Sequence, residues 1–238
     1  MTPTEISPGL VVNIATPELR LSDFKLIAFD MDSTLINIEC VDEIADAAGR
    51  KTEVAAITEA AMRGDITDYK ESLRQRVALL AGVSVDSMEE VYHQRLQLNP
   101  GAAELVHACK AAGMKVLLVS GGFTFFTDRV RDELGIDYTR SNVLEIKDGL
   151  LTGKMIDQPW GDICDGAEKR TMLLQTCDML NIEPSQAIAM GDGANDLPMM
   201  GVAGLSVAYH AKPKVREQAM VAINEGGLDR LLEVLKAS

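Results

Sequence analysis

The sequence predicts an α/β protein in which a mostly parallel sheet is interrupted by an inserted group of helices. Three short apolar runs end abruptly at polar residues or glycines, as buried strands do. Each run adjoins sequence with helical spacing, and strands that alternate with helices form parallel sheets. About 70 residues separate the first run from the second, too many for an ordinary crossover. We therefore expect a separate unit to be inserted between these two strands.

The three predicted strands are Leu26 to Phe29, Lys115 to Val119 and Ala187 to Met190. They end, in the same order, at Asp30, at Ser120-Gly121-Gly122 and at Gly191-Asp192-Gly193. An amphipathic helix is predicted from Ala102 to Ala112, with Gly113 as its C-cap. Ligands of parallel sheets bind beyond the carboxyl ends of the strands, so we expect the three polar clusters to meet there.

Residues 40–98 are predicted to form the insertion, a helical cap domain. Four segments of it have helix-like apolar spacing: Glu43 to Ala48, Glu53 to Met62, Tyr69 to Leu80 and Met88 to Leu96. Gly49, Gly64 and Gly82 interrupt this spacing, which predicts separate helices.

The rest of the chain is assigned to an α/β core made of residues 24–39 and 99–238. A small β-hairpin is predicted within this core at about 142–160, around Lys147-Asp148-Gly149. Residues 1–23 contain three prolines and no sustained periodicity. We predict that they form an irregular lead-in or an edge element without chemistry.

Length and composition exclude several classes of protein. The 238 residues, 47% of them hydrophobic, can bury a full core, and neither the four cysteines nor the three histidines have ligand spacing. We find no signal peptide and no run near the roughly 18 apolar residues of a membrane span. A cytoplasmic location without a membrane partner is therefore expected.

The charge of the chain bears on its partners. A formal net charge of -13 repels polyphosphate backbones, and no local basic patch offsets it, so we expect no nucleic-acid partner. A small anionic substrate is compatible with this charge if a metal and a few cations screen the site. The sequence does not indicate the oligomeric state.

Asp30 and Asp32 form the first candidate catalytic cluster, in Asp30-Met31-Asp32-Ser33-Thr34 at the end of a predicted strand. Two carboxylates two positions apart can divide the work, one attacking as a nucleophile while the other carries a proton. Taken alone, the same residues also fit an acidic turn that caps the next helix.

Three further clusters fit phosphate chemistry. Ser120-Gly121-Gly122 offers a hydroxyl and unobstructed backbone N–H groups to phosphate oxygens, although glycine turns after strands are common. The loop Gly191 to Asp196 carries two carboxylates and an amide, which suit a hard cation such as Mg²⁺ but also a helix cap. Lys169 lies in an early turn of a predicted helix, against the helix dipole, where an exposed lysine is the usual explanation.

In this order the four clusters resemble the motifs of the haloacid dehalogenase superfamily: DxDx[ST], then Ser or Thr, then Lys, then GDGxND. The resemblance covers roughly residues 24–236. It implies a Rossmann-like parallel core with a helical cap, Mg²⁺ as the cofactor and phosphoryl transfer through an aspartyl phosphate.

The predicted cap resembles one family of this superfamily more narrowly, the phosphoserine phosphatases. The resemblance is carried by DMDSTLINIE at 30–39, VDEIA at 41–45, AMRG at 61–64 and SLRQRV at 72–77. In that family the residue matching Glu39 meets the serine ammonium, and the residue matching Arg76 meets the serine carboxylate. The implied substrate is O-phosphoserine, hydrolysed in serine biosynthesis. An amino-acid zwitterion does call for one fixed anion and one planar fork of donors.

The resemblance also implies roles for the core residues. Asp30 would be the nucleophile and Asp32 the proton donor and base, while Asp30, Asp192 and the backbone carbonyl of Asp32 would hold Mg²⁺. The residues expected around the substrate phosphate are Ser120, the Gly121 N–H, Lys169 and Asn195. Asp196 would support the last loop.

Two alternatives stay open. The same chemistry fits another small phosphate ester, or transfer of the phosphoryl group to an acceptor other than water. A phospho-accepting signalling domain also uses an acidic pocket, a hydroxyl residue and a lysine. The long cap and the GDGAND loop argue against that second alternative.

Overall fold

The computed structural model describes residues 3–14, 19–63 and 68–236. Its centre is a nine-stranded sheet in the order β1-β2-β9-β8-β7-β3-β4-β5-β6. The strands are β1 Thr4–Ser7, β2 Leu10–Val12, β3 Leu26–Phe29, β4 Lys115–Phe123, β5 Tyr138–Lys147, β6 Leu150–Ile156, β7 Ala187–Gly191, β8 Leu205–Tyr209 and β9 Val221–Ile223. The six strands from β9 to β5 pair in parallel, and antiparallel pairs stand at both edges. The predicted α/β class with a mostly parallel sheet is confirmed.

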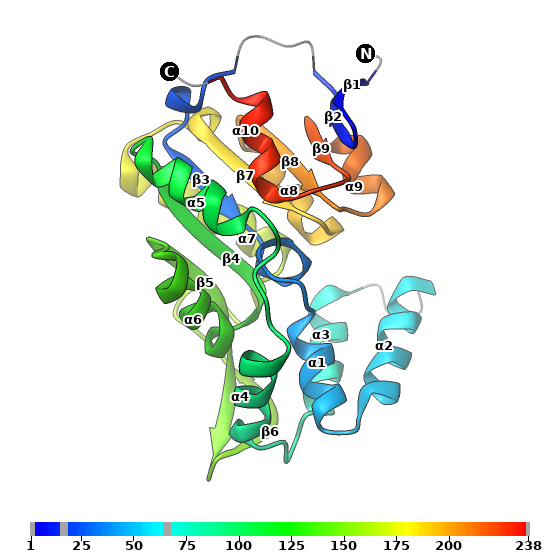
Figure 1. The fold of residues 1–238 in the computed structure, drawn as a ribbon. Coiled ribbons are helices and arrows are strands. Elements are labelled where there is room, and N and C mark those ends of the chain that lie inside the picture. The colour runs from blue at the N-terminus through cyan, green and yellow to red at the C-terminus, as the bar shows by residue number, and fades with distance from the viewer. Residues whose placement is uncertain (1–2, 15–18, 64–67, 237–238) are drawn as a thin grey trace.

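Helices cover both faces of the sheet (Figure 1). One apolar cluster includes α5 (Ala102–Ala111), α6 (Thr124–Leu134) and α10 (Leu231–Val234), and the other includes α7 (Gly166–Leu180), α8 (Leu197–Met200) and α9 (Pro213–Gln218). Side chains of β3 alternate between the clusters, with Ile27 and Phe29 in the first and Leu26 and Ala28 in the second. A strand buried on both faces therefore appears as a continuous apolar run in the sequence.

The central strands bring the polar clusters to one edge. β3 lies between β4 and β7, and Phe29 pairs with Leu118 on one side and Met190 on the other. Because all three strands are parallel, Asp30, Ser120 and Asp192 follow at the same end of the sheet. One detail differs from the prediction: β4 continues to Phe123, so Ser120-Gly121-Gly122 belongs to the end of the strand.

The predicted cap segment is helical. It contains α1 (Cys40–Ala47), α2 (Lys51–Arg63), α3 (Tyr69–Ala78) and α4 (Val85–Gln94). Helices α1, α2 and α3 lie beyond the ends of the central strands, whereas α4 lies beside the hairpin of β5 and β6 (Figure 1). Gly49 and Gly82 have positive φ angles of 72° and 81° at the breaks, whereas Gly64 lies outside the described residues. The four predicted helices are confirmed, but α1, α2 and α4 begin earlier than expected. The boundaries of the cap at 40 and 98 stay a prediction.

The predicted hairpin is present as β5 and β6, joined at Asp148 and Gly149, whose φ angles are 51° and 76°. Strand β5 begins earlier than predicted because its first residues pair in parallel with β4. Strand β6 bonds to the loop before α4: the Gly82 and Leu151 amides donate to the Leu151 and Val83 carbonyls at 2.8 Å each. The hairpin thus connects the core to the segment predicted as a cap.

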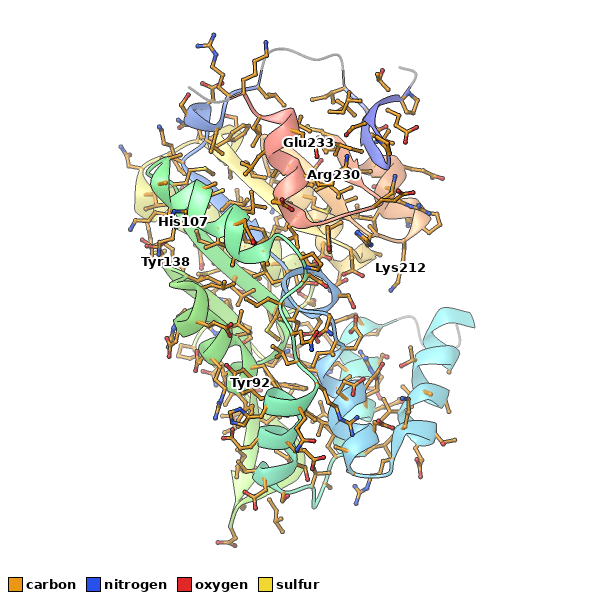
Figure 2. The ribbon with its side chains drawn as sticks, viewed as in Figure 1. Tyr92, His107, Tyr138, Lys212, Arg230 and Glu233 are labelled. Carbon is orange, nitrogen blue, oxygen red and sulfur yellow. The ribbon has the colours of Figure 1, made fainter. Side chains whose placement is uncertain are left out.

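Residues near the N-terminus extend the sheet as β1 and β2, so the edge-element alternative describes them. Arg230 holds this edge, because its guanidinium donates to the Pro8 carbonyl at 2.5 Å and pairs with Glu233 at 2.8 Å (Figure 2). Within the described ranges, no helix combines the length and the apolar character that crossing a membrane requires.

Candidate active site

A cavity of about 580 Å³ lies where the carboxyl ends of the central strands face α1, α2 and α3. This volume suits a small metabolite. Of the ten residues predicted for the site, eight line the cavity: Asp30, Asp32, Glu39, Arg76, Ser120, Gly121, Asp192 and Asn195. The other two, Lys169 and Asp196, are fully buried behind the cavity: Lys169 contacts Asp30, and Asp196 contacts Lys169.

Asp30 is fixed at the tip of β3. Its amide donates to the Met190 carbonyl of β7 at 3.0 Å, and its carboxylate accepts from the Met31 amide at 2.7 Å. Burial and the neighbouring charges of Asp196 and Asp192 raise the pKa of this carboxyl well above its ordinary value, against the opposing effect of Lys169. The side chain is held in one orientation, with one face directed at the cavity.

Lys169 lies in the first turns of α7, and the burial of its side chain could not be inferred from the sequence. Its ammonium is fully buried and lies 2.7 Å from Asp30 and 2.6 Å from Asp196. Burial alone would lower the pKa of this amine, but the two carboxylates raise it well above its ordinary value. A buried lysine with two anionic partners stays charged, so the site carries a fixed cation beside Asp30.

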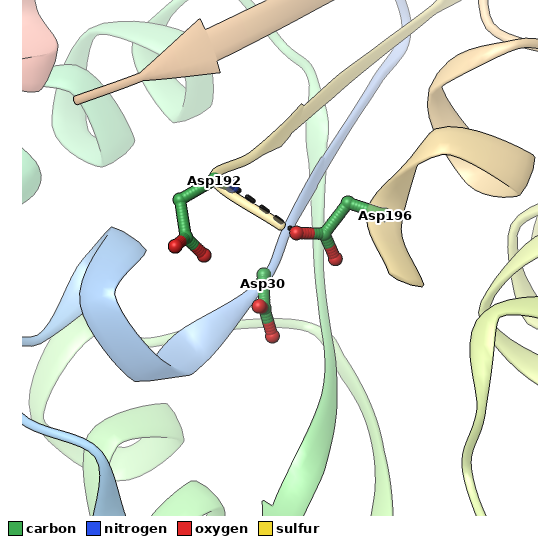
Figure 3. Close-up of side chains that lie close together, drawn as sticks. All are labelled: Asp30, Asp192 and Asp196. Carbon is green, nitrogen blue, oxygen red and sulfur yellow. Dashed lines mark hydrogen bonds between the residues drawn. The ribbon is translucent and has the colours of Figure 1, made fainter. Parts of the chain in front are cut away.

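Three carboxylates converge beside this cation: Asp30, Asp192 and Asp196 (Figure 3). One oxygen from each lies within 4.8 Å of the others. Burial, then Asp196 and Glu39, raise the pKa of Asp192 to about 7. A single lysine does not neutralise three carboxylates, two of them buried and the third half-buried, and oxygen ligands suit a hard divalent cation. The donor set therefore fits a metal ion.

The three carboxylates differ in how many donors they already accept. Asp196 takes Lys169 on Oδ1, and takes the amides of Asp192 and Gly193 on Oδ2 at 3.1 and 2.9 Å. These bonds occupy both oxygens and fold the 191–196 loop around the side chain. Asp196 consequently fits a supporting role, while Asp30 and Asp192 have oxygens left for a ligand.

Asp32 lies across the cavity in a tight turn, where Ser33 has a φ angle of 57°. Its Oδ2 accepts from the Cys40 amide at 3.0 Å, and its Oδ1 lies 3.2 Å from the Cys40 thiol. Burial and the charge of Glu39 raise the pKa of Asp32 to about 7. A carboxyl with that pKa can both give and take a proton near neutral pH.

Ser120 and Gly121 form a small cradle at the end of β4. Ser120 is fully buried, and its Oγ accepts from the Gly122 amide at 2.8 Å, which leaves the hydroxyl hydrogen to donate elsewhere. At Gly121, an added Cβ would lie 2.1 Å from the Tyr69 hydroxyl of α3. Only a glycine allows α3 to approach the core this closely.

The far side of the cavity carries Arg76, in the segment predicted as a cap, and Glu39, which directly precedes that segment. The Glu39 carboxylate accepts from the Ser33 hydroxyl at 2.6 Å. The Nε of Arg76 and one oxygen of Asp42 are both buried, and each lacks a hydrogen-bond partner among the described residues. A buried donor without a partner is costly, so a ligand acceptor at Arg76 would relieve a real deficit.

Several polar residues at the site were not predicted from the sequence, among them Asp42 and Tyr69, which line the cavity, and Cys40, which contacts Asp32. These three lie on helices of the predicted cap, where apolar spacing identifies the helix but does not show which polar side chain faces the core. Lys212 also lines the cavity and counters the charge of Asp192 (Figure 2). It directly precedes α9 in the core and comes near Asp192 only through the fold, which local spacing does not show.

Known proteins resemble the chain along nearly its whole length. A family model described as haloacid dehalogenase-like hydrolase matches residues 24–204. A phosphoserine phosphatase of Polaromonas sp. strain JS666 is 86% identical over 99% of this chain and 100% of its own length. A phosphoserine phosphatase of Albidiferax ferrireducens is 75% identical over the same shares. A substrate-bound phosphoserine phosphatase structure has a TM-score of 0.81 at 38% identity, covering 90% of this chain and 99% of that one.

Proposed function

Because this chain belongs to the haloacid dehalogenase-like hydrolases, we propose that it hydrolyses O-phosphoserine to serine and phosphate, a reaction of serine biosynthesis. One observation carries the choice of substrate: a single cavity joins the carboxylates at the strand ends to the unpaired, buried Nε of Arg76. A substrate with a phosphate ester at one end and a carboxylate at the other would place its phosphorus beside Asp30 and give the Arg76 Nε an acceptor.

In this proposal, Asp30 attacks phosphorus, and the bond from phosphorus to the seryl oxygen breaks. Asp32 gives its proton to that departing oxygen, so serine leaves as a neutral alcohol. Asp32 then takes a proton from a water molecule that attacks the aspartyl phosphate, which frees Asp30 and releases phosphate. The pKa of about 7 at Asp32 supports both proton transfers.

Mg²⁺ is the metal that we propose for the acidic cluster. Asp30, Asp192 and the backbone carbonyl of Asp32 would hold it, because both oxygens of Asp196 already accept hydrogen bonds. When bound, the ion would offset the repulsion between the phosphate dianion and the carboxylates.

Four groups would stabilise the remaining negative charge of the phosphate: the Ser120 hydroxyl, the Gly121 N–H, the Lys169 ammonium and the Asn195 amide. Lys169 is already fixed 2.7 Å from Asp30, so its charge lies where the transferred group must pass. Preorganised donors of this kind stabilise charge without reorganising during the reaction.

Glu39 and Arg76 recognise the amino-acid end in this proposal. Arg76 presents its guanidinium fork to the carboxylate, and Glu39 accepts from the ammonium. The adjoining helices would close over the substrate and exclude bulk water. The cytoplasmic location remains a prediction. All four cysteines are free and buried, which is compatible with it.

A panel of phosphorylated metabolites, with released phosphate as the readout, tests the function. We expect phosphoserine to have the highest kcat/KM, and serine and phosphate to be the products. If another small ester is preferred, the proposed substrate is wrong while the chemistry stands. If a second alcohol in the assay takes up the phosphoryl group in place of water, the chain is a phosphotransferase.

A further inference from the structure

We propose that Cys40 is a positioning residue that holds the carboxylate of Asp32 in the orientation needed for proton transfer. This inference rests on the proposed function, because it assumes that Asp32 carries the proton. Cys40 is the first residue of α1. It has no direct role in the chemistry and acts only through its neighbour.

Both oxygens of Asp32 are held by this one residue. The Cys40 amide donates to Oδ2 at 3.0 Å, and the Cys40 Sγ lies 3.2 Å from Oδ1. When Asp32 is ionised its carboxylate can only accept, and the thiol is then the donor. Two contacts from one rigid residue fix the plane of the carboxylate as well as its position.

The thiol is fully buried against this carboxylate, and Cys40 has no exposed surface. Glu39, the residue before it, points instead to the Ser33 hydroxyl at 2.6 Å. Among the described residues, the two hydrogen bonds recorded to the Asp32 side chain both come from Cys40.

The two contacts differ in strength, and that difference suits the reaction. The amide belongs to the first turn of a helix, where N–H groups lack intrahelical partners and favour a nearby anion. A thiol is a weak donor. Oδ1 can therefore exchange a proton with the substrate in the orientation that Cys40 sets, because the thiol competes only weakly for that oxygen while the amide holds Oδ2.

The position of α1 links this contact to the rest of the fold. The apolar face of the helix, which includes Val41, Ile44 and Ala45, is buried in the main core cluster. Cys40 therefore cannot shift without moving the helix. A side chain fixed in this way can transmit the position of α1 to the carboxylate that it contacts.

Two variants separate the donor from the space that it fills. Cys40→Ala removes the thiol, and we expect kcat for phosphoserine to fall about 3- to 10-fold with KM changed by less than about twofold. Cys40→Ser keeps a donor in nearly the same volume and should restore kcat to within about twofold of wild type. If Cys40→Ala does not fold, Cys40→Val, which fills the space without a donor, takes its place.

A double-mutant cycle tests whether Cys40 acts through Asp32. In an Asp32→Asn background, measured by single turnover with excess enzyme, Cys40→Ala should change the rate by less than about twofold. Cys109→Ala is the matched control, since Cys109 is equally buried but lies in α5 and packs only in the core. It should lower the melting temperature without lowering kcat.

Three results would overturn the inference. Cys40→Ala could keep the wild-type kcat, or Cys40→Ser could lose as much kcat as Cys40→Ala. Cys40→Ala could also lower the rate by the same factor in the Asp32→Asn background as in the wild-type protein. Failure of the proposed function has a different signature: the wild-type protein would then release no phosphate from phosphoserine. If only the role of Asp32 is wrong, Asp32→Asn alone would turn over phosphoserine at the wild-type rate, whatever residue stood at position 40.

Discussion

Lys70 of α3 lies 2.6 Å from Asp162, which belongs to the core segment before α7, so an ion pair joins the two sides of the cavity. Arg74, one turn further along α3, reaches the other oxygen of the same carboxylate at 2.5 Å. These hydrogen bonds raise the pKa of Lys70 and lower that of Asp162, which keeps both groups charged. Tyr69, beside Lys70, closes over Gly121. The pairs thus hold α3 against the core.

Replacing Asp162 should loosen this closure. Asp162→Asn removes both ion pairs, and exposed pairs contribute little individually, so we expect kcat/KM to fall only about 2- to 10-fold. The wild-type value should decline with added salt, whereas that of the variant should be nearly flat. Asp132→Asn, which breaks an exposed pair with Arg131 inside α6, is the control and should change neither. If kcat/KM depends equally on salt in the wild type, Asp162→Asn and Asp132→Asn, the ion pairs of Asp162 do not control how α3 packs against the core.

Gly121 should not tolerate any side chain. In Gly121→Ala the new Cβ would lie 2.1 Å from the Tyr69 hydroxyl, so α3 could not close, and we expect kcat/KM to fall at least about 100-fold. Adding Tyr69→Phe removes the clashing oxygen and should restore part of the activity. Its remaining ring carbon at 3.3 Å would keep the recovery incomplete. If the double variant is no better than Gly121→Ala, the loss arises at the phosphate cradle instead of at α3.

The sequence predicted the strands and their polar ends well, because strands buried on both faces leave continuous apolar runs. Asp30, Ser120 and Asp192 could be placed together from topology alone, since parallel strands share an edge. Lys169 looked like an exposed helical lysine. Its burial depends on Asp30 and Asp196, which are distant in the sequence, and local periodicity carries no information about such pairing.

The start of α1 shows the same limit. Apolar spacing predicted a helix from Glu43, but the helix begins at Cys40, where the Asp32 carboxylate satisfies its first amide. Tyr69 was likewise expected only as the start of a helix, and its approach to Gly121 depends on how α3 packs against the core. Contacts between elements decide these features, so one sequence does not show them.

Asp30→Asn should abolish turnover while leaving the protein folded. An amide of nearly the same shape cannot attack phosphorus, yet its oxygen can still accept from Lys169 and from the Met31 amide. We expect no phosphate release above background, with a melting temperature within about 3 °C of wild type. Substantial activity in a highly purified sample would place the nucleophile elsewhere.

Removing divalent metal should stop the reaction, and Mg²⁺ should restore it. Mg²⁺ should also raise the melting temperature, because an ion that binds the folded state stabilises it. Asp192→Asn is the internal control: it should lose both the activity and the Mg²⁺-dependent shift in melting temperature. Zinc should substitute poorly, since the cluster offers only oxygen ligands. Full activity in metal-free buffer would refute the metal site.

Arg76 should determine which substrates are accepted, because its buried Nε lacks a partner until a ligand supplies one. Arg76→Ala should cost about 2–5 kcal/mol in kcat/KM for phosphoserine, roughly a thirty- to several-thousand-fold loss, since truncation leaves the substrate carboxylate unpaired. Phosphoethanolamine keeps the ammonium and the phosphate but lacks that carboxylate. It should be a poor substrate already, and should lose much less when Arg76 is removed.

The two changes form a double-mutant cycle in which one mutation is made on the ligand. Phosphoglycerate lacks the ammonium, so comparing the loss of kcat/KM in Glu39→Gln for phosphoserine and for phosphoglycerate tests whether Glu39 binds that group. Arg74→Ala is the matched control, because this arginine lies on the same helix but pairs with Asp162, so its loss should affect both substrates alike. If Arg76→Ala also lowers kcat/KM for phosphoserine and for phosphoethanolamine by the same factor, the arginine contacts the phosphate or helps α3 to pack against the core instead of binding the carboxylate. The phosphoserine proposal would then lose its main support in the geometry of the cavity.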